Sequence, residues 1–355
     1  MLHSPIEDRI VSAYFLCTQE PSDLLEELKP ELNQLIALPA DAKASMLGFA
    51  LSEIFPWQNE LSTGIDAELF SASHLIQPDL FIRVRPGKEK LVKEKLYRAG
   101  IEFNPISPTC FSLNNSVNLA GVINLDEDAV VQDYNSQRVG EFLDSPPGRP
   151  GRTGARNSLA RPSTPLGIGD HSSTPLSVYD CCAASGGKSI LAVDVLGNIQ
   201  LTVSDIRESI LVNLRKRFAR AGISNYNAFT IDLQQPNLKP ETLNLKPETL
   251  DLVICDAPCT GSGTWSRTPE QLYYFNEERI DAYSELQQNI SANVLRFLKK
   301  DGILLYVTCS VFKKENERNV QFLIKQHNLK LHNMEMLTGY DQKADTMFAA
   351  LLQKM

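Results

Sequence analysis

Short apolar runs alternate with longer amphipathic segments over residues 178–308, and this alternation constrains the fold more than any other feature of the sequence. The apolar runs lie at 178–182, 201–204, 228–231, 252–255 and 303–308, and helical periodicity follows residue 188 and covers 208–221 and 279–299. Apolar strands separated by helices form a parallel sheet that is covered on both faces. The sequence therefore predicts an α/β fold with a Rossmann-like, doubly wound and mostly parallel sheet.

Three units are predicted along the chain, namely an N-terminal helical region at 1–70, a small α+β module at 71–125 and the α/β domain at 126–355. Residues 145–177 are rich in Pro, Gly, Ser, Thr and Arg and have no apolar periodicity, which predicts a flexible inserted loop. A tandem repeat at 237–250 has the character of a surface duplication, since lengthening a loop costs little closure entropy.

The formal net charge of −8 argues against a polyanion partner for the chain as a whole, but basic residues are concentrated between Arg83 and Arg98. Phe81, Arg83 and Arg85 would share one face of a predicted strand, which is the chemistry of a surface that stacks bases and holds phosphates. On this basis Arg83, Arg85 and Lys88 are candidate RNA contacts. A solvated sheet face beside a solvated helix explains the same pattern equally well.

The cysteines and the apolar segments predict the cellular compartment of the protein. Seven cysteines, an odd number without the spacing of a disulfide framework, indicate a reducing compartment. No apolar segment is long enough to span a bilayer, and no basic stretch precedes an apolar run at the N-terminus. We therefore expect a cytoplasmic monomer that does not associate with membranes.

Small residues and acids lie at successive strand ends, where ligands of such sheets bind. The first strand leads into the loop Cys182, Ala183, Ala184, Ser185, Gly186, Gly187 and Lys188. This loop is not a phosphate loop of the usual form, because that motif requires a glycine at position 182. Asp205 can accept both ribose hydroxyls of a nucleoside, and Asp232 can meet the adenine edge. The pair favours S-adenosylmethionine over a triphosphate, although either acid alone could be a helix cap.

Two thiols follow the fourth and fifth strands, as Cys259 in the segment 256–265 and Cys309 in the segment 307–310. Carbon 5 of cytosine accepts a methyl group only after a nucleophile has added at carbon 6, and a thiolate suits that step. A lone cysteine is usually an inert small hydrophobe, but two beside Asp256 and a nucleoside site are harder to explain as packing. A zinc site is not expected, because Cys255 lies inside a strand and no histidine pair has ligand spacing.

The chain resembles the Sun-type (Fmu-like) RNA cytosine-5 methyltransferases. It carries their motifs in the same order, at 182–188, Asp205, Asp232, 256–259 and 308–309. The resemblance extends upstream to residues 131–137 and covers roughly 79–355. It implies an RNA substrate, with ribosomal RNA ahead of transfer RNA, and S-adenosylmethionine held by residues 182–188, Asp205, Asp232 and Asp256.

The resemblance also implies a division of labour. Cys309 would add to carbon 6 of the cytosine, Cys259 would assist breakdown of the adduct and product release, and Asp256 would hydrogen-bond the base near nitrogen 3. Trp265 and Arg267 are further candidates for lining the RNA path, or the tryptophan packs beneath its loop.

The sequence departs from the family pattern at two positions. Ser185 replaces a proline, and Ile210 stands where an arginine often follows the ribose aspartate, with Arg207 as a possible substitute. Three alternatives stay open: a DNA cytosine-5 methyltransferase, in which Cys259 would be the nucleophile; a non-catalytic RNA-binding or assembly protein; and a nucleotide triphosphatase.

Overall fold

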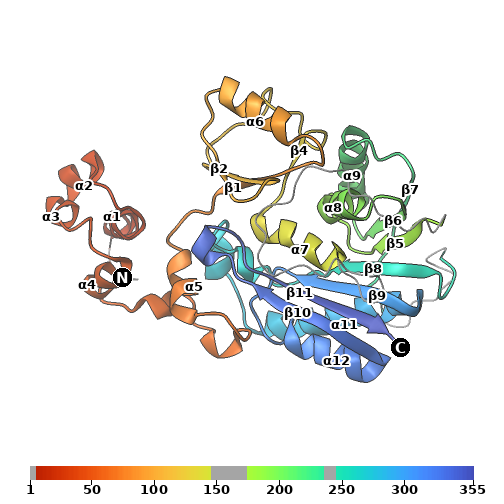
Figure 1. Ribbon diagram of the computed structural model, residues 1–355. Helices are drawn as coiled ribbons and strands as arrows, with labels where there is room; N and C mark the ends of the chain where they lie inside the picture. Colours follow the sequence, from red (N-terminus) through yellow and green to blue (C-terminus); the bar gives the residue numbers. More distant parts are fainter. Residues whose placement is uncertain (1–4, 145–173, 236–244) are drawn as a thin grey trace.

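The computed structural model describes residues 5–144, 174–235 and 245–355 (Figure 1). Its larger sheet has the strand order β10-β11-β9-β8-β5-β6-β7, and the five strands from β9 to β7 pair in parallel. These five are β5 (Leu176–Asp180), β6 (Ile199–Asp205), β7 (Tyr226–Thr230), β8 (Leu250–Asp256) and β9 (Leu298–Thr308). The predicted Rossmann-like fold is therefore confirmed. Most of the predicted inserted loop and the first part of the tandem repeat lie outside the described residues.

Helices cover both faces of this sheet (Figure 1). One face carries α7 (Tyr134–Asp144), α8 (Gly187–Leu196) and α9 (Glu208–Arg220), and the other carries α11 (Glu278–Leu295) and α12 (Glu317–His327). Adjacent residues at the centre of β5 show why it lacks an alternation of apolar and polar side chains. Val178 packs in the first core and Tyr179 in the second, and neither side chain is exposed. A strand buried on both faces has no polar alternation.

Beyond the five predicted strands, the chain adds β10 (Leu329–Leu337) and β11 (Met347–Lys354). β11 lies between β9 and β10 and runs antiparallel to both. The helix predicted to continue to residue 299 ends at Leu295 instead. Residues 298–299 belong to β9, which has an irregularity before Ile303, where Asp301 has a φ of 64° and the register with β8 shifts.

The strand order reverses between β5 and β8, since the chain continues from β5 to β6 on one side and returns to β8 on the other. Ligand crevices of open parallel sheets lie outside the carboxyl ends of strands at such a point. The topology therefore brings the loops that follow β5, β8 and β9 to one edge of the sheet.

The described part of the N-terminal region, from residue 5 to residue 73, contains five short α-helices (Figure 1). They are α1 (Ile6–Cys17), α2 (Asp23–Leu28), α3 (Pro30–Asn33), α4 (Ala40–Met46) and α5 (Ala67–Ser73). Phe55 and Phe70 pack with Phe312 and Trp265 behind the loops that follow β8 and β9. Trp265 is only 1% exposed, so the expectation that it lines an RNA path is wrong, and the alternative of packing beneath its loop is correct.

The small α+β module consists of α6 (Glu89–Arg98) and a four-stranded sheet of order β2-β3-β1-β4. Its strands are β1 (Leu80–Val84), β2 (Asn104–Pro105), β3 (Cys110–Leu113) and β4 (Ala129–Val131). β4 pairs with β1, so the sheet continues past the predicted boundary at residue 125. The extension depends on the pairing of β4 with β1, which lies about 45 residues earlier in the sequence, so the local sequence does not reveal it.

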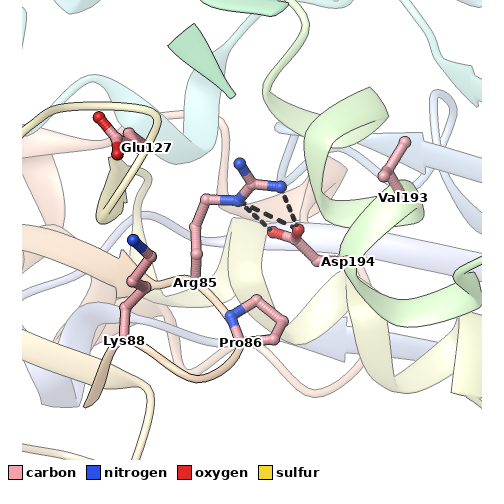
Figure 2. Close-up of a pocket in the computed structure, with 6 residues that line it drawn as sticks. All are labelled: Arg85, Pro86, Lys88, Glu127, Val193 and Asp194. Carbon is pink, nitrogen blue, oxygen red and sulfur yellow. Dashed lines mark hydrogen bonds and ion pairs between the residues drawn. The ribbon is translucent and has the colours of Figure 1, made fainter. Parts of the chain in front are cut away.

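Two arginines of the module form ion pairs with Asp194 of α8. Arg83 Nη1 lies 2.6 Å from the Asp194 carboxylate. Arg85 Nη2 lies 2.7 Å from the same carboxylate, and Figure 2 shows this pair. Lys88, at the rim of the same hollow in Figure 2, pairs with Asp128 at 3.6 Å. The expectation that Arg83 and Arg85 hold RNA phosphates is therefore wrong in this structure, because both guanidinium groups join the module to the α/β domain.

We predict that Asp194→Ala lowers the free energy of unfolding by about 3–5 kcal/mol, because it leaves the Arg83 charge buried without its partner. The side chains of Arg83 and Asp194 are only 7% and 6% exposed. Asp8→Ala is the matched control, since its ion pair with Lys29 is 45% and 42% exposed and should contribute less than about 1 kcal/mol. Equal effects of the two substitutions in urea unfolding would contradict this role of Asp194.

Candidate active site

The structure brings together the two cysteines that follow neighbouring strands. β8 and β9 are parallel, with Asp256 opposite Val307, so the two strands end at the same level. Cys259 Sγ lies 3.3 Å from Cys309 Sγ, and both side chains are half-buried. Two sulfur atoms in contact at the edge where ligands bind can both reach one bound base. The catalytic roles of the cysteines stay predictions.

An ion pair lies beside the thiols. Lys188, in the first turn of α8, places its Nζ 2.6 Å from Asp256 Oδ2 at the end of β8. Burial alone would lower the pKa of Lys188, but the Asp256 carboxylate outweighs it and raises that pKa, and Cys309 and Asp180 act in the same direction. Lys188 therefore stays protonated, and its ammonium group lies near the Cys309 sulfur.

The environment of Cys259 differs from that of Cys309. The hydrogen bond with Cys309 and burial raise the pKa of Cys259 well above its usual range, and the negative charge of Glu315 adds to them. Cys259 therefore remains a thiol that can donate its proton toward Cys309. The arrangement favours Cys309 as the nucleophilic sulfur.

The loop between β5 and α8 has an unusual backbone that only small residues allow. Ala184 and Gly186 have φ values of 45° and 86°. A Cβ on Gly186 would lie 2.6 Å from a ring atom of Phe218, so this position requires glycine. Ser185 receives hydrogen bonds from Arg217 Nη1 on its hydroxyl and its carbonyl oxygen, at 2.9 and 3.1 Å. Arg217 thus holds the loop where the family pattern has a proline.

The acids predicted to hold a nucleoside lie at neighbouring strand ends. Asp205 Oδ2 accepts a hydrogen bond from the Ala184 amide at 3.0 Å, which joins the end of β6 to the small-residue loop. Arg207 Nε lies 3.2 Å from Asp205 Oδ1. Arg207 therefore supplies a positive charge beside Asp205, which Ile210 cannot supply in place of the family's arginine. The Ile231 amide bonds to the Asp205 carbonyl, which places Asp232 beside it. An open backbone loop next to two carboxylates fits an adenosyl group.

Three polar residues near the site were not predicted from the sequence. Asp180, the last residue of β5, is fully buried, accepts a hydrogen bond from Ser189 at 2.6 Å, and has its pKa raised to about 7 by burial. Its place at a strand end was a usable signal. Arg217 lies within α9 and Glu315 lies in a loop, and neither position has a local pattern that distinguishes it.

Arg267 links three segments instead of facing the site as a free cation. Its Nε lies 2.7 Å from Asp345 and its Nη2 lies 2.9 Å from Asp133, in the upstream segment 131–137. Arg267 therefore has a structural role, and because its side chain is 31% exposed the RNA contact expected of it stays a prediction. Gly263 nearby donates its amide to the Cys309 carbonyl at 2.9 Å, and a Cβ there would lie 1.9 Å from the Thr346 carbonyl oxygen. This close backbone contact fixes the loop beside Cys309.

Within residues 5–144, 174–235 and 245–355, no cluster of three or more His, Cys, Asp and Glu side chains could hold a metal ion. In the same ranges, every helix is too short or too polar to cross a membrane.

The sheet order, the small-residue loop and the acids at the next strand ends define the class of S-adenosylmethionine-dependent methyltransferases. The family model described as 16S rRNA methyltransferase RsmB/F matches residues 171–352, about half of the chain, and the chain belongs to this family. The resemblance inferred from the sequence is thereby confirmed.

Two relatives agree with this assignment. Ribosomal RNA small subunit methyltransferase B of Xanthomonas campestris is 29% identical over 189 residues, which cover 50% of this chain and 42% of that protein. The Pasteurella multocida protein of the same name is 30% identical over 43% of this chain and 34% of its own length. The chain thus spans less than half the length of these relatives.

Among solved structures, NSun6 from Pyrococcus horikoshii with SFG superposes with a TM-score of 0.65 at 15% identity, covering 85% of this chain and 97% of that one. A methyltransferase homologue from the same organism gives 0.63 at 21% identity, covering 89% and 98%. At these identities the likeness shows the fold alone.

We predict that a mild thiol oxidant such as diamide joins Cys259 to Cys309 in a reversible disulfide, because their sulfur atoms already lie 3.3 Å apart. Peptide mass spectrometry before and after reduction measures the bond. Cys309→Ala must abolish this cross-linked peptide, whereas Cys17→Ala, at the distant end of α1, must not change it. Persistence of two free thiols in the oxidised parent protein would contradict the observed contact.

Proposed function

We propose that the chain is a cytoplasmic RNA cytosine-5 methyltransferase that modifies ribosomal RNA with S-adenosylmethionine. The observation that carries the proposal is the contact of Cys259 and Cys309 beside the Lys188–Asp256 ion pair. The printed names of the relatives, which are ribosomal RNA small subunit methyltransferases, support the substrate class. The ligand SFG of the superposed NSun6 structure, an analogue of S-adenosylmethionine, supports the cofactor.

In the proposed reaction, the thiolate of Cys309 attacks carbon 6 of a cytosine that has been unstacked from the RNA. The sulfur–carbon bond forms as the double bond between carbons 5 and 6 gives up its electron pair to the ring. Asp256, held by Lys188 as a carboxylate, accepts a hydrogen bond from the amino group on carbon 4, beside nitrogen 3, and so orients the base. The Lys188 ammonium supplies the positive charge that stabilises the negative charge developing near nitrogen 3. S-adenosylmethionine, when bound, supplies the methyl group that carbon 5 accepts.

The adduct must then break down to release product. Carbon 5 loses its proton to a base, the double bond between carbons 5 and 6 forms again, and the bond from Cys309 breaks to regenerate a thiolate. Cys259 is the protonated group next to the departing sulfur, since their separation is 3.3 Å. A neighbouring thiol stabilises the leaving thiolate and opposes its return to the ring.

The proposal predicts that cells lacking the gene lose 5-methylcytosine at one or more ribosomal RNA positions, and that the parent gene restores it. Cys309→Ala should restore none, because the neighbouring Cys259 remains a thiol and does not replace the attacking sulfur. Cys17→Ala, an exposed thiol outside the α/β domain, is the control and should restore the modification fully. Bisulfite sequencing of total RNA measures each result. Restoration by Cys309→Ala, or an unchanged RNA map in the deletion, would refute the proposed activity.

A second variant distinguishes the role of Cys259 from that of Cys309. Cys259→Ala should retain attack by Cys309 but slow release, so that protein accumulates on RNA as a covalent complex. Denaturing gel electrophoresis after incubation with RNA and S-adenosylmethionine detects that complex. The complex should disappear in the double variant Cys259→Ala with Cys309→Ala. Its presence in the double variant would mean that a different residue attacks the base.

A further inference from the structure

A single buried carboxylate, that of Glu315, accepts four hydrogen bonds from the surrounding segments. Glu315 lies between β9 and α12 and is not exposed to solvent. Its donors are the Thr260 amide at 3.0 Å, Thr260 Oγ1 at 2.6 Å, Ser310 Oγ at 2.5 Å and Gln287 Nε2 at 2.8 Å. Burial raises the pKa of Glu315, and the hydrogen bonds from Ser310, Thr260 and Gln287 oppose that rise because they favour the ionised carboxylate.

The donors flank the two cysteines. Thr260 directly follows Cys259, and Ser310 directly follows Cys309. Gln287 of α11 also donates to the Pro258 carbonyl at 2.9 Å, just before Cys259. Glu315 therefore ties the loop after β8 to the loop after β9, and each tie lies one residue from a reacting sulfur.

The charges around the two sulfurs are different. Glu315 and Cys309 are the titratable groups that act on Cys259, and both raise its pKa, whereas a hydrogen bond from the Gly261 backbone lowers it. The Lys188–Asp256 ion pair, from α8 and β8, lies instead in the field of Cys309. The Glu315 carboxylate thus acts on Cys259, whereas the neighbour of Cys309 is an ion pair whose two charges oppose each other.

We propose that Glu315 is a positioning residue that holds the two cysteine loops together and so determines which sulfur is the nucleophile. The inference deepens the proposed function, because it assumes that one of the two cysteines attacks the base. Glu315 does not touch the base in this account. It acts through Cys259 and Cys309 by alignment and by charge.

Glu315→Gln distinguishes the effect of the negative charge of Glu315 from the effect of its hydrogen bonds, which align the two cysteine loops. A glutamine can accept from the Thr260 amide and Gln287 through its oxygen, and its amide group can donate to the Thr260 and Ser310 hydroxyls, which also accept hydrogen bonds. The four contacts are retained and the negative charge is lost. The pH midpoint for alkylation of Cys259 should therefore fall, and its alkylation rate at pH 8 should rise about threefold or more.

Glu315→Ala removes alignment as well. We expect at least about a hundredfold loss of kcat for RNA methylation with an unchanged KM for S-adenosylmethionine, because the cofactor loop after β5 is outside these contacts. Glu317→Gln is the matched control, since it neutralises a nearby carboxylate that bonds Ser62 and Thr63 instead of the cysteine loops. It should change neither the alkylation rate nor kcat.

The experiment alkylates each full-length protein with iodoacetamide over a range of pH, without RNA, and measures Cys259 and Cys309 separately by peptide mass spectrometry. Faster alkylation of Cys259 in Glu315→Gln, with Glu317→Gln like the parent, supports the inference. Equal rates in all three proteins overturn it. If the parent methylates no RNA, the proposed function fails, and the alkylation comparison still decides the role of Glu315.

Discussion

The parallel pairing of β8 with β9 is the constraint on which the rest of the site depends. Because the two strands end at the same level, the loops that follow them emerge side by side at the edge of the sheet. Cys259 and Cys309 are far apart in the sequence, yet their sulfur atoms come within 3.3 Å. The reversal of strand order at β5 opens the same edge to a ligand, so the fold places a thiol pair where a nucleoside can bind.

Two cysteines in contact are chemically alike until their surroundings distinguish them. Lys188 places a protonated amine near Cys309, and Glu315 places a buried carboxylate near Cys259. The same two charged groups also have mechanical roles, since Lys188 holds Asp256 and Glu315 joins the two loops. Lys188 and Glu315 therefore each combine a charge near one of the cysteines with a contact that holds a loop of the site.

The sequence predicted the parts of this structure that depend on local pattern. Strand ends, small residues and the dipeptides Pro258-Cys259 and Thr308-Cys309 can be read from the local sequence. They were expected to lie together because the carboxyl ends of parallel strands lie at one edge of the sheet. The errors concern residues whose partners are distant in sequence. Arg83 pairs with Asp194 of α8, and Trp265 packs against Phe55 of the N-terminal region. Both partners become visible only when the chain has folded.

Glu315 was missed for a related reason. It lies in a loop with no periodicity, and its significance comes from donors on three different segments. The added strands β10 and β11 likewise depend on β9, which provides the edge against which β11 pairs. Local sequence can identify residues suited to chemistry, whereas the groups that orient them are defined by tertiary contacts.

The most direct test of the central claim is to identify which sulfur bonds to the base. RNA that contains 5-fluorocytidine should arrest the reaction after attack, because carbon 5 then carries no proton to lose, and the adduct can be digested and sequenced by mass spectrometry. The account predicts that the modified nucleotide is attached to the peptide containing Cys309, with Cys259 unmodified. A nucleotide attached to Cys259, or to neither cysteine, would contradict it.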